Sequence, residues 1–236
     1  MGILGIISGT IVVGKSDLLK DHKTLTLSND YGKSCALVTD KIALIPRHGN
    51  DPHEHIPPHL INHRANLKAL KDLGVSEVVA VNSTGSLKID LRPGMIVIPD
   101  DFITLTAIPT IHQNKAVHVV PSLNENVRQK LIRAANNCQI PVVEKGIYWQ
   151  TTGPRLETRA EIRMMANFAD IVGMTMASEA VVALELGLPY ASACSVDNFG
   201  NGLLEEPLSL KEITSGARKN SAAMMRIIQN YLEVSS

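Results

Sequence analysis

Polar residues follow several apolar runs at the points where strands are expected to end. They supply hydroxyl groups, glycine-exposed backbone N–H groups and one arginine, which together can bind an oxyanion such as phosphate. Any one of these segments read alone is an ordinary turn or helix cap. The segments are Ser8-Gly9-Thr10, Pro46-Arg47-His48-Gly49, the run from Asn82 to Ser86, Thr151-Thr152-Gly153, Met174-Thr175 and Asp197-Asn198.

The kind of anion is narrowed by two motifs that the sequence lacks. It contains neither the Walker pattern G-x-x-x-x-G-K-[ST] nor the dinucleotide pattern G-x-G-x-x-G. Free phosphate is therefore the expected anion, rather than a nucleoside triphosphate or a dinucleotide. We expect no metal, because no ligand cluster with metal-type spacing is present.

The composition indicates a small-molecule partner. Lys plus Arg and Asp plus Glu both number 23, so no net charge draws the protein to nucleic acid or an acidic membrane. The three cysteines show no paired spacing, which favours reduced thiols. No basic leader precedes the first apolar run, and no run is long enough to span a membrane. We expect a soluble, cytoplasmic protein.

These polar segments must be positioned by alternating strands and helices, which predict an α/β fold with a twisted, mixed, largely parallel central sheet flanked by helices. Nothing marks a domain boundary, so residues 1–236 are expected to form a single domain. The expected strands are 3–7, two within 34–49, 76–82, 94–103, 146–152, 170–174 and 190–196. The expected helices are 57–74, 123–137, 158–168, 176–186 and 209–232.

The order of several motifs resembles the trimeric purine nucleoside phosphorylases and their methylthio-nucleoside relatives over about residues 4–215. The motifs are GIISGT, PRHG, IPPHLINHRANLKAL, NSTGSL with PGMIVIPDDFI, GPRLETRAE, ADIVGMT and the late SVDN stretch. The resemblance implies a homotrimer or hexamer, a pentosyltransferase activity, phosphate as co-substrate and no cofactor.

The resemblance also implies roles for single residues. The phosphate positions are Thr10, Arg47, His48, Ser83 and the adjacent Asn82, with Thr175 contacting phosphate or ribose. Met174 matches the residue packed under the ribose, and Leu156 replaces a purine-stacking phenylalanine. His118 matches a residue that reaches into the neighbouring subunit's site.

The chain departs from the family pattern at three places. Ser8-Gly9-Thr10-Ile11 replaces a loop richer in glycine, which puts its fit around phosphate in question. Ser178 stands where the family generally has proline. The altered histidine spacing leaves open whether His53 or His55 faces the ligand.

The resemblance places Glu157 where 6-oxopurine phosphorylases have a glutamate facing the base. A carboxylate can accept the hydrogen on N1 of hypoxanthine or guanine, whereas N1 of adenine is itself an acceptor. Facing acceptors in a buried site cost on the order of a few kcal/mol. The alternative is that Glu157 only pairs with Arg155 or Arg159 on an exposed turn.

The resemblance places Asn198 where 6-oxopurine enzymes have an asparagine and adenine-specific enzymes an aspartate. An asparagine amide can donate to N7 and O6 as negative charge builds on the departing base. A register shift of one residue would put Asp197 there instead and would favour adenine. Glu157, Asn198 and His48 are the expected catalytic residues.

The 5′ end of the sugar is expected near Leu210, which falls where ordinary purine nucleoside phosphorylases have a histidine. An apolar side chain suits a methylthio group, while helix-start packing is an equal alternative. The sequence predicts phosphorolysis of 5′-methylthioinosine to hypoxanthine and 5-methylthioribose 1-phosphate in purine salvage. Alternatives are a phosphorylase for inosine and guanosine, a methylthioadenosine phosphorylase, a water-using nucleosidase and a non-catalytic nucleoside-binding protein.

Overall fold

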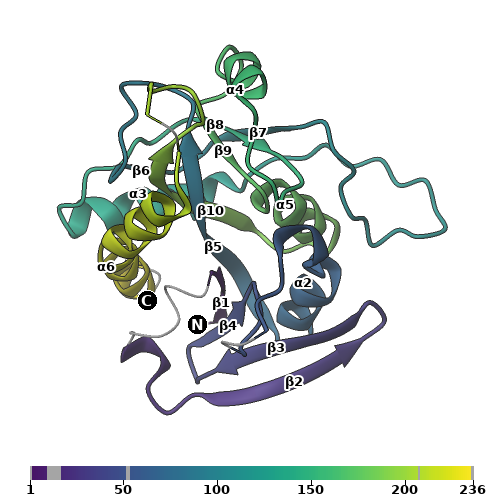
Figure 1. The fold of residues 1–236 in the computed structure, drawn as a ribbon. Coiled ribbons are helices and arrows are strands. Elements are labelled where there is room, and N and C mark those ends of the chain that lie inside the picture. Colours follow the sequence, from purple (N-terminus) through teal and green to yellow (C-terminus); the bar gives the residue numbers. More distant parts are fainter. Residues whose placement is uncertain (1, 10–16, 52–53, 207, 235–236) are drawn as a thin grey trace.

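A single mixed sheet runs through the molecule with helices on both faces (Figure 1). The computed structural model describes residues 2–9, 17–51, 54–206 and 208–234. The strands are β1 (Ile3–Ser8), β2 (Lys23–Asn29), β3 (Gly32–Val38), β4 (Ile42–Pro46), β5 (Val75–Ser86), β6 (Ile96–Val97), β7 (Asp101–Thr104), β8 (Ile147–Gln150), β9 (Ile171–Gly173) and β10 (Tyr190–Phe199). The helices are α2 (His63–Asp72), α3 (Glu125–Asn137), α4 (Arg159–Met165), α5 (Met176–Glu185) and α6 (Leu210–Val234), with short 3₁₀ turns at Asp17–Leu19 and Pro58–Leu60.

The strand order is β2-β3-β4-β1-β5-β9-β8-β7, and β10 pairs with both β5 and β6. Strand β1 is parallel to β4 and β5, β10 is parallel to β5, and β7, β8 and β9 are mutually parallel. Antiparallel pairs occur at β2–β3, β3–β4, β5–β9 and β6–β10. The predicted α/β architecture with a mixed, largely parallel sheet is confirmed.

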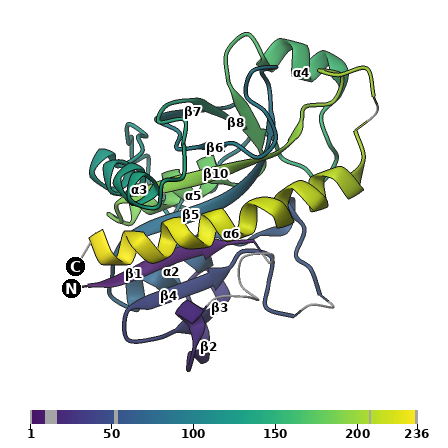
Figure 2. The same cartoon turned by 90° about the vertical axis from the view of Figure 1, so that its left-hand side faces the viewer.

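Two apolar layers separate the sheet from the helices. On one face α2 and α5 bury Leu67, Leu70 and Val182 against the sheet. On the other face α3 and α6 bury Leu131 and Ile227, and α6 lies along the sheet for most of its length (Figure 2). The alternating strand residues and the apolar stripes of these helices therefore bury one another.

Helix starts follow the local sequence. Asn62 and Asn124 cap α2 and α3 by accepting from the backbone N–H groups of Ala65 and Val127. Thr158 and Glu161 form a reciprocal capping box at the start of α4. This box fixes where the chain turns after residues 153–157, the segment with the predicted base contact.

The observed boundaries correct four expectations. The predicted helix 57–74 begins only at His63, where Asn62 caps it, after a separate 3₁₀ turn at Pro58–Leu60. The predicted strand 76–82 continues to Ser86, because β9 and β10 both pair with its end. The predicted strand 94–103 divides into β6 and β7. Strand β2 was missed because it is a polar edge strand with little continuous apolar sequence.

No helix among the described residues is long and apolar enough to cross a membrane.

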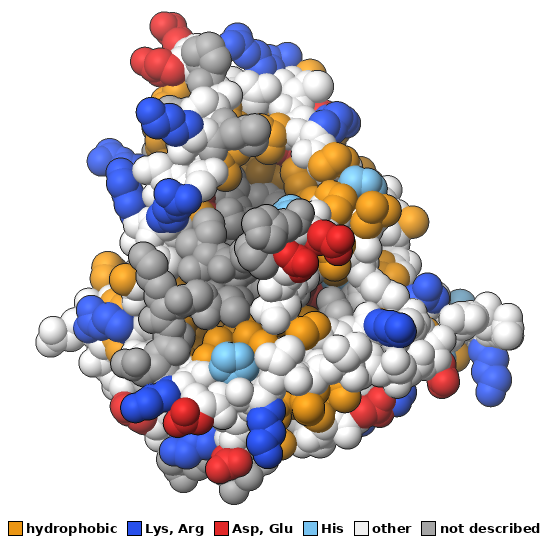
Figure 3. Space-filling view, turned by 60° about the horizontal axis from the view of Figure 1, so that its bottom comes forward, with side chains coloured by type: hydrophobic (Ala, Val, Ile, Leu, Met, Phe, Trp, Pro, Cys, Tyr) orange, Lys and Arg blue, Asp and Glu red, His pale blue; other side chains and the backbone are white. Residues whose placement is uncertain are grey.

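The surface is hollowed on the face shown in Figure 3, where apolar side chains line parts of the rim.

Candidate active site

A cavity of about 480 Å³ lies where the ends of several strands meet, a size ordinary for small-molecule sites. Its wall is assembled from segments far apart in the sequence: the ends of β1, β4, β5, β9 and β10, the turn after β8, and one face of α6. The parallel strands β1, β4, β5 and β10 bring their carboxyl ends to the same edge, and β9 reaches it because it pairs antiparallel with the end of β5. The predicted site residues that line it are Arg47, His48, Ser83, Leu156, Glu157, Met174, Thr175, Asp197 and Asn198.

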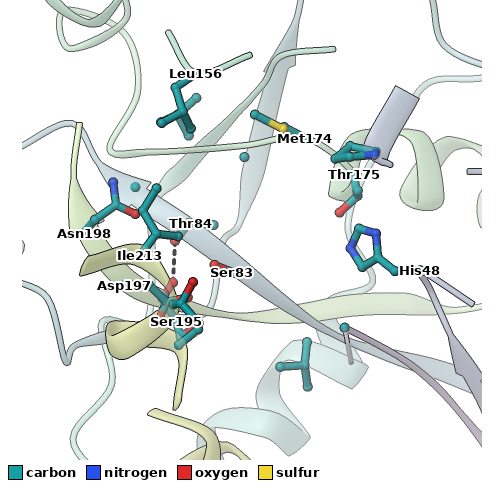
Figure 4. A pocket seen from close by; sticks show the side chains of 18 of the residues that line it. His48, Ser83, Thr84, Leu156, Met174, Thr175, Ser195, Asp197, Asn198 and Ile213 are labelled. Atoms are coloured by element: carbon teal, nitrogen blue, oxygen red, sulfur yellow. Dashed lines mark hydrogen bonds between the residues drawn. The ribbon is translucent and has the colours of Figure 1, made fainter. Parts of the chain in front are cut away.

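The labelled side chains of Figure 4 separate into two ends of this cavity. Leu156 and Asn198 lie at one end, and Thr175 and His48 lie at the other. Ser83 lies between the two ends, and Asp197 lies beside Ser195 near the end that holds Asn198. The predicted base contacts and the predicted anion contacts are therefore brought to opposite ends of one cavity.

Arg47 is buried at the anion end and is already engaged. Its Nε and Nη2 donate to the Glu179 carboxylate at 2.5 and 3.1 Å. Its Nη1 donates to Val81 O at 2.9 Å, and Nη2 donates to Ile7 O at 3.4 Å. The sequence suggested a guanidinium free to bind phosphate through two parallel hydrogen bonds, but here its forked pair of donors faces Glu179.

His48 is held as a neutral ring. Its Nδ1 lies 2.8 Å from the carbonyl oxygen of Ile56, which can only accept, so Nδ1 carries the hydrogen. The ring stacks on His55 with centroids 4.5 Å apart. Burial lowers the pKa of His48 to about 4, despite the Ile56 hydrogen bond. Its Nε2 is therefore an acceptor, suited to the hydroxyl of a hydrogen phosphate ion.

Thr175 owes its orientation to Asn82. The Asn82 amide donates to Thr175 Oγ1 at 2.8 Å and in turn accepts from Ser192 at 2.6 Å. Within the described part of the chain, the hydroxyl hydrogen of Thr175 has no acceptor and can therefore donate to an anion. Asn82 itself is buried behind the cavity wall, so its predicted place beside phosphate becomes a supporting one.

Glu157 faces the cavity from the turn after β8, and it is only 8% exposed. Thr151 donates to its Oε1 at 2.6 Å, and Asn201 donates to its backbone oxygen at 3.0 Å. Arg155 pairs with Glu161 instead, at 2.7 Å. The alternative that Glu157 only pairs with Arg155 on an exposed turn is therefore wrong, and the described residues show no ion pair between Glu157 and Arg159 either. Among the described residues, Oε2 of Glu157 accepts no hydrogen bond, which leaves it for a donor in the cavity.

Asp197 and Asn198 both line the cavity because β10 is irregular there. The pairing of β10 with β5 shifts between Val196 and Asn198, which leaves Asp197 as an extra residue in the strand. Successive residues of a regular strand point to opposite faces, so the bulge is what brings both to one site. Both residues that the two alternative registers would place at the base therefore line the cavity.

The two side chains are held differently. Asp197 Oδ1 accepts from Asn220 of α6 at 2.8 Å, while Oδ2 has no hydrogen-bond partner among the described residues. Burial raises the pKa of Asp197, which the nearby Ser83, Asn220 and Ser195 only partly offset. Asn198 donates one amide hydrogen to Phe199 O at 2.8 Å. Among the described residues, its second amide hydrogen and its side-chain oxygen are left to bind a ligand in the cavity.

Apolar groups complete the cavity. Met174 packs against Gly153, whose φ of +67° favours glycine at this turn. Leu208, Ile213 and Ala217 line the cavity from α6 and the segment before it. The sequence analysis did not predict these residues. The signal that could have found them is the spacing of Ile213 and Ala217, which are four residues apart and so lie on one face of the helix.

Several predicted residues lie elsewhere. Thr10 and His53 fall outside the described residues, whereas His55 lines the cavity. Leu210 is the first residue of α6, but its side chain is not among those described. His118 is exposed in the irregular segment between β7 and α3 and does not line the cavity of its own chain. Its contact with a neighbouring subunit stays a prediction.

Comparison with known proteins decides the family. The model of the phosphorylase superfamily matches residues 4–233. The chain belongs to the phosphorylase superfamily. The resemblance seen in the sequence is thereby confirmed.

Individual members of the superfamily match over nearly their whole length. A probable 6-oxopurine nucleoside phosphorylase of Archaeoglobus fulgidus is 39% identical and covers 98% of this chain and 96% of its own. A probable S-methyl-5′-thioinosine phosphorylase of Methanocaldococcus jannaschii is 35% identical, and the match covers 98% of this chain and 92% of that protein. The structure of the methylthioadenosine phosphorylase of Schistosoma mansoni, solved with adenine, superposes with a TM-score of 0.89 at 29% identity. The match covers 100% of this chain and 92% of that chain.

Proposed function

We propose that this protein is a pentosyltransferase that cleaves a 6-oxopurine nucleoside, preferably 5′-methylthioinosine, with phosphate. The products are hypoxanthine and 5-methylthioribose 1-phosphate, a step of purine salvage. The observation that carries the base assignment is the buried Glu157, with one carboxylate oxygen left for the cavity. The names of the two archaeal relatives agree with it.

The base is stabilised by its two polar neighbours. Glu157 accepts the hydrogen on N1 of a 6-oxopurine, and the free amide hydrogen of Asn198 serves N7 or O6. The Asn198 contact strengthens as the departing purine gains negative charge, so it favours the transition state over the bound nucleoside, whereas the Glu157 contact selects the base.

Phosphate binds toward the opposite end, near Arg47, His48 and Thr175, with Ser83 on its side facing the middle of the cavity. One of its oxygens forms the new bond to C1′ as the bond from C1′ to the purine nitrogen breaks. Hydrogen phosphate loses its proton in the reaction, and the purine anion gains one, so the two products balance. No cofactor takes part in this proposal.

The preference for a methylthio group rests on the apolar side of α6. Leu208, Ile213 and Ala217 offer contact to a thioether and no charge to a 5′-hydroxyl. An apolar pocket discriminates against an added hydroxyl by only about 10²-fold. Inosine is therefore expected to be a slower substrate rather than an inert one.

The test is base release from 5′-methylthioinosine, inosine, guanosine and 5′-methylthioadenosine, each with and without phosphate. We expect phosphate-dependent release that is fastest from 5′-methylthioinosine. Fastest release from 5′-methylthioadenosine would contradict the base assignment. Release that does not need phosphate would indicate a nucleosidase, and binding without release would indicate a nucleoside-binding protein.

We also propose a cytoplasmic homotrimer, from the resemblance of the sequence to the trimeric enzymes. In such an assembly the exposed segment that carries His118 contacts a neighbouring subunit.

A further inference from the structure

Beneath the anion end of the cavity lies a buried ion pair between Arg47 and Glu179, which are 3% and 1% exposed. Glu179 is on α5, and Arg47 follows β4, so the pair joins a helix to the sheet. Tyr190 of β10 donates to Glu179 Oε2 at 2.8 Å. Both oxygens of the carboxylate are therefore occupied.

The N–H groups of Arg47 can be counted against their partners. A guanidinium has five N–H donors, one on Nε and two on each terminal nitrogen. Four hydrogen bonds to Glu179, Val81 O and Ile7 O occupy Nε, both hydrogens of Nη2 and one of Nη1. Within the part of the chain described, a single Nη1 hydrogen is left for an anion in the cavity.

The charge of Arg47 is offset as well. Its closest ionic partner is Glu179, and the nearby histidine, His63, is 3.9 Å from the same carboxylate. Burial lowers the pKa of His63 to about 4, so this ring adds no positive charge at neutral pH. Phosphate therefore meets an arginine that is largely neutralised by its neighbour.

We propose that Glu179 is a positioning residue of the phosphate site, one that restrains Arg47 to a single hydrogen bond with the anion. This inference rests on the proposed function, which makes phosphate the nucleophile. An anion gripped by the full guanidinium fork would be stabilised before reaction as well as during it. Such ground-state binding does not speed the chemical step. Glu179 thus keeps phosphate weakly held and free to move toward C1′.

The test variant is Glu179→Gln, which keeps the size of the side chain and one acceptor for Arg47. The substitution removes the negative charge of Glu179 and the carboxylate oxygen that accepts from Nη2 of Arg47. Nη2 can then donate to phosphate. One added charge-assisted hydrogen bond corresponds to about a tenfold change in affinity. We expect calorimetry without nucleoside to give a phosphate Kd about tenfold lower than in the wild type. The KM for phosphate should also fall, kcat should not rise, and the KM for the nucleoside should stay unchanged.

Tyr190→Phe is the matched control. It removes a hydrogen bond from the same carboxylate in the same buried cluster but leaves the ion pair intact. Its phosphate Kd should lie within about twofold of the wild type, since Arg47 stays restrained. Equal changes in both variants would indicate general loosening of the core and would overturn the proposal.

An unchanged or higher phosphate Kd in Glu179→Gln would also overturn it. If that variant does not fold, Glu179→Asp, which keeps the charge but retracts the carboxylate, should lower the Kd in the same direction. A wild type that binds phosphate while Glu179→Gln shows no tightening rejects this inference alone. A wild type that binds no phosphate rejects the proposed function and this inference together.

Discussion

Two glutamates on one turn illustrate how surroundings decide the role of a side chain. Glu161 is at the protein surface, where it pairs with Arg155 and caps α4. Glu157, four residues earlier, is buried at the cavity and receives a hydrogen bond from Thr151. A buried carboxylate needs hydrogen-bond partners to offset its lost hydration. We expect the ligand to supply the partner for the second oxygen of Glu157.

Glu157→Ala should separate these roles. A 6-oxopurine would then leave its N1 hydrogen without an acceptor, at a cost of about 1–3 kcal/mol. We expect kcat/KM for 5′-methylthioinosine to fall about 10- to 100-fold, measured by hypoxanthine release. The control is Glu161→Ala, which should keep kcat/KM within about twofold and lose only about 1 kcal/mol of stability with its cap. Similar kinetic losses in both variants would contradict the assigned base contact.

At the scale of elements, the site depends on how α6 meets the bulge of β10. Asn220 of α6 donates to Asp197 and to Val196 O, at 2.8 and 3.1 Å. Gly216, one turn earlier, brings the helix backbone directly onto Asp197. A glycine inside a helix costs about 1 kcal/mol relative to alanine, so close packing is the reason for it here.

Gly216→Ala tests this contact. The added Cβ would collide with the backbone oxygen of Asp197, so α6 must move away from β10. The clash should outweigh the gain in helix propensity and leave a net loss of about 2 kcal/mol or more. We expect a Tm lower by about 5 °C or more in calorimetry, together with a higher KM for the nucleoside.

The neighbouring exposed Ser215 provides the control for this change. Ser215→Ala should alter stability by less than about 0.5 kcal/mol. If Gly216→Ala is as stable and active as the wild type, α6 does not hold the bulge in place.

At the scale of the whole molecule, a long irregular segment joins β7 to α3 and extends away from the sheet (Figure 1). It carries Leu105 and Val120, which are 78% and 88% exposed. Exposed apolar side chains on a segment of this kind are typical of surfaces that another protein chain covers.

The proposed trimer gives a direct expectation. Light scattering should return a mass near three times the 25.6 kDa of one chain. Val120→Asp places a charge in the covered surface and should shift the mass toward that of a single chain, whereas Lys68→Gln on α2 should leave it unchanged. A wild-type mass of one chain across micromolar concentrations would reject the trimer.

Local sequence determined much of what was predicted about this protein. Hydrophobic periodicity located most helices and strands to within a few residues, because a buried face must repeat with the period of its element. The start of α2 was predicted six residues too early, at 57 instead of His63. Capping residues such as Thr158 acted within one helical turn, so their effect could be read directly. The motifs indicated the family and placed Glu157 and Asn198 among the site residues.

Only the tertiary structure decided how those residues are used. It paired Arg47 with Glu179, 132 residues away, and moved Asn82 from the cavity to a support behind it. It also brought Asp197 and Asn198 into one cavity through a bulge that depends on β5 and α6. Each of these outcomes depends on hydrogen bonds between groups that are far apart in the sequence. Such groups come within hydrogen-bonding distance only when the chain has folded.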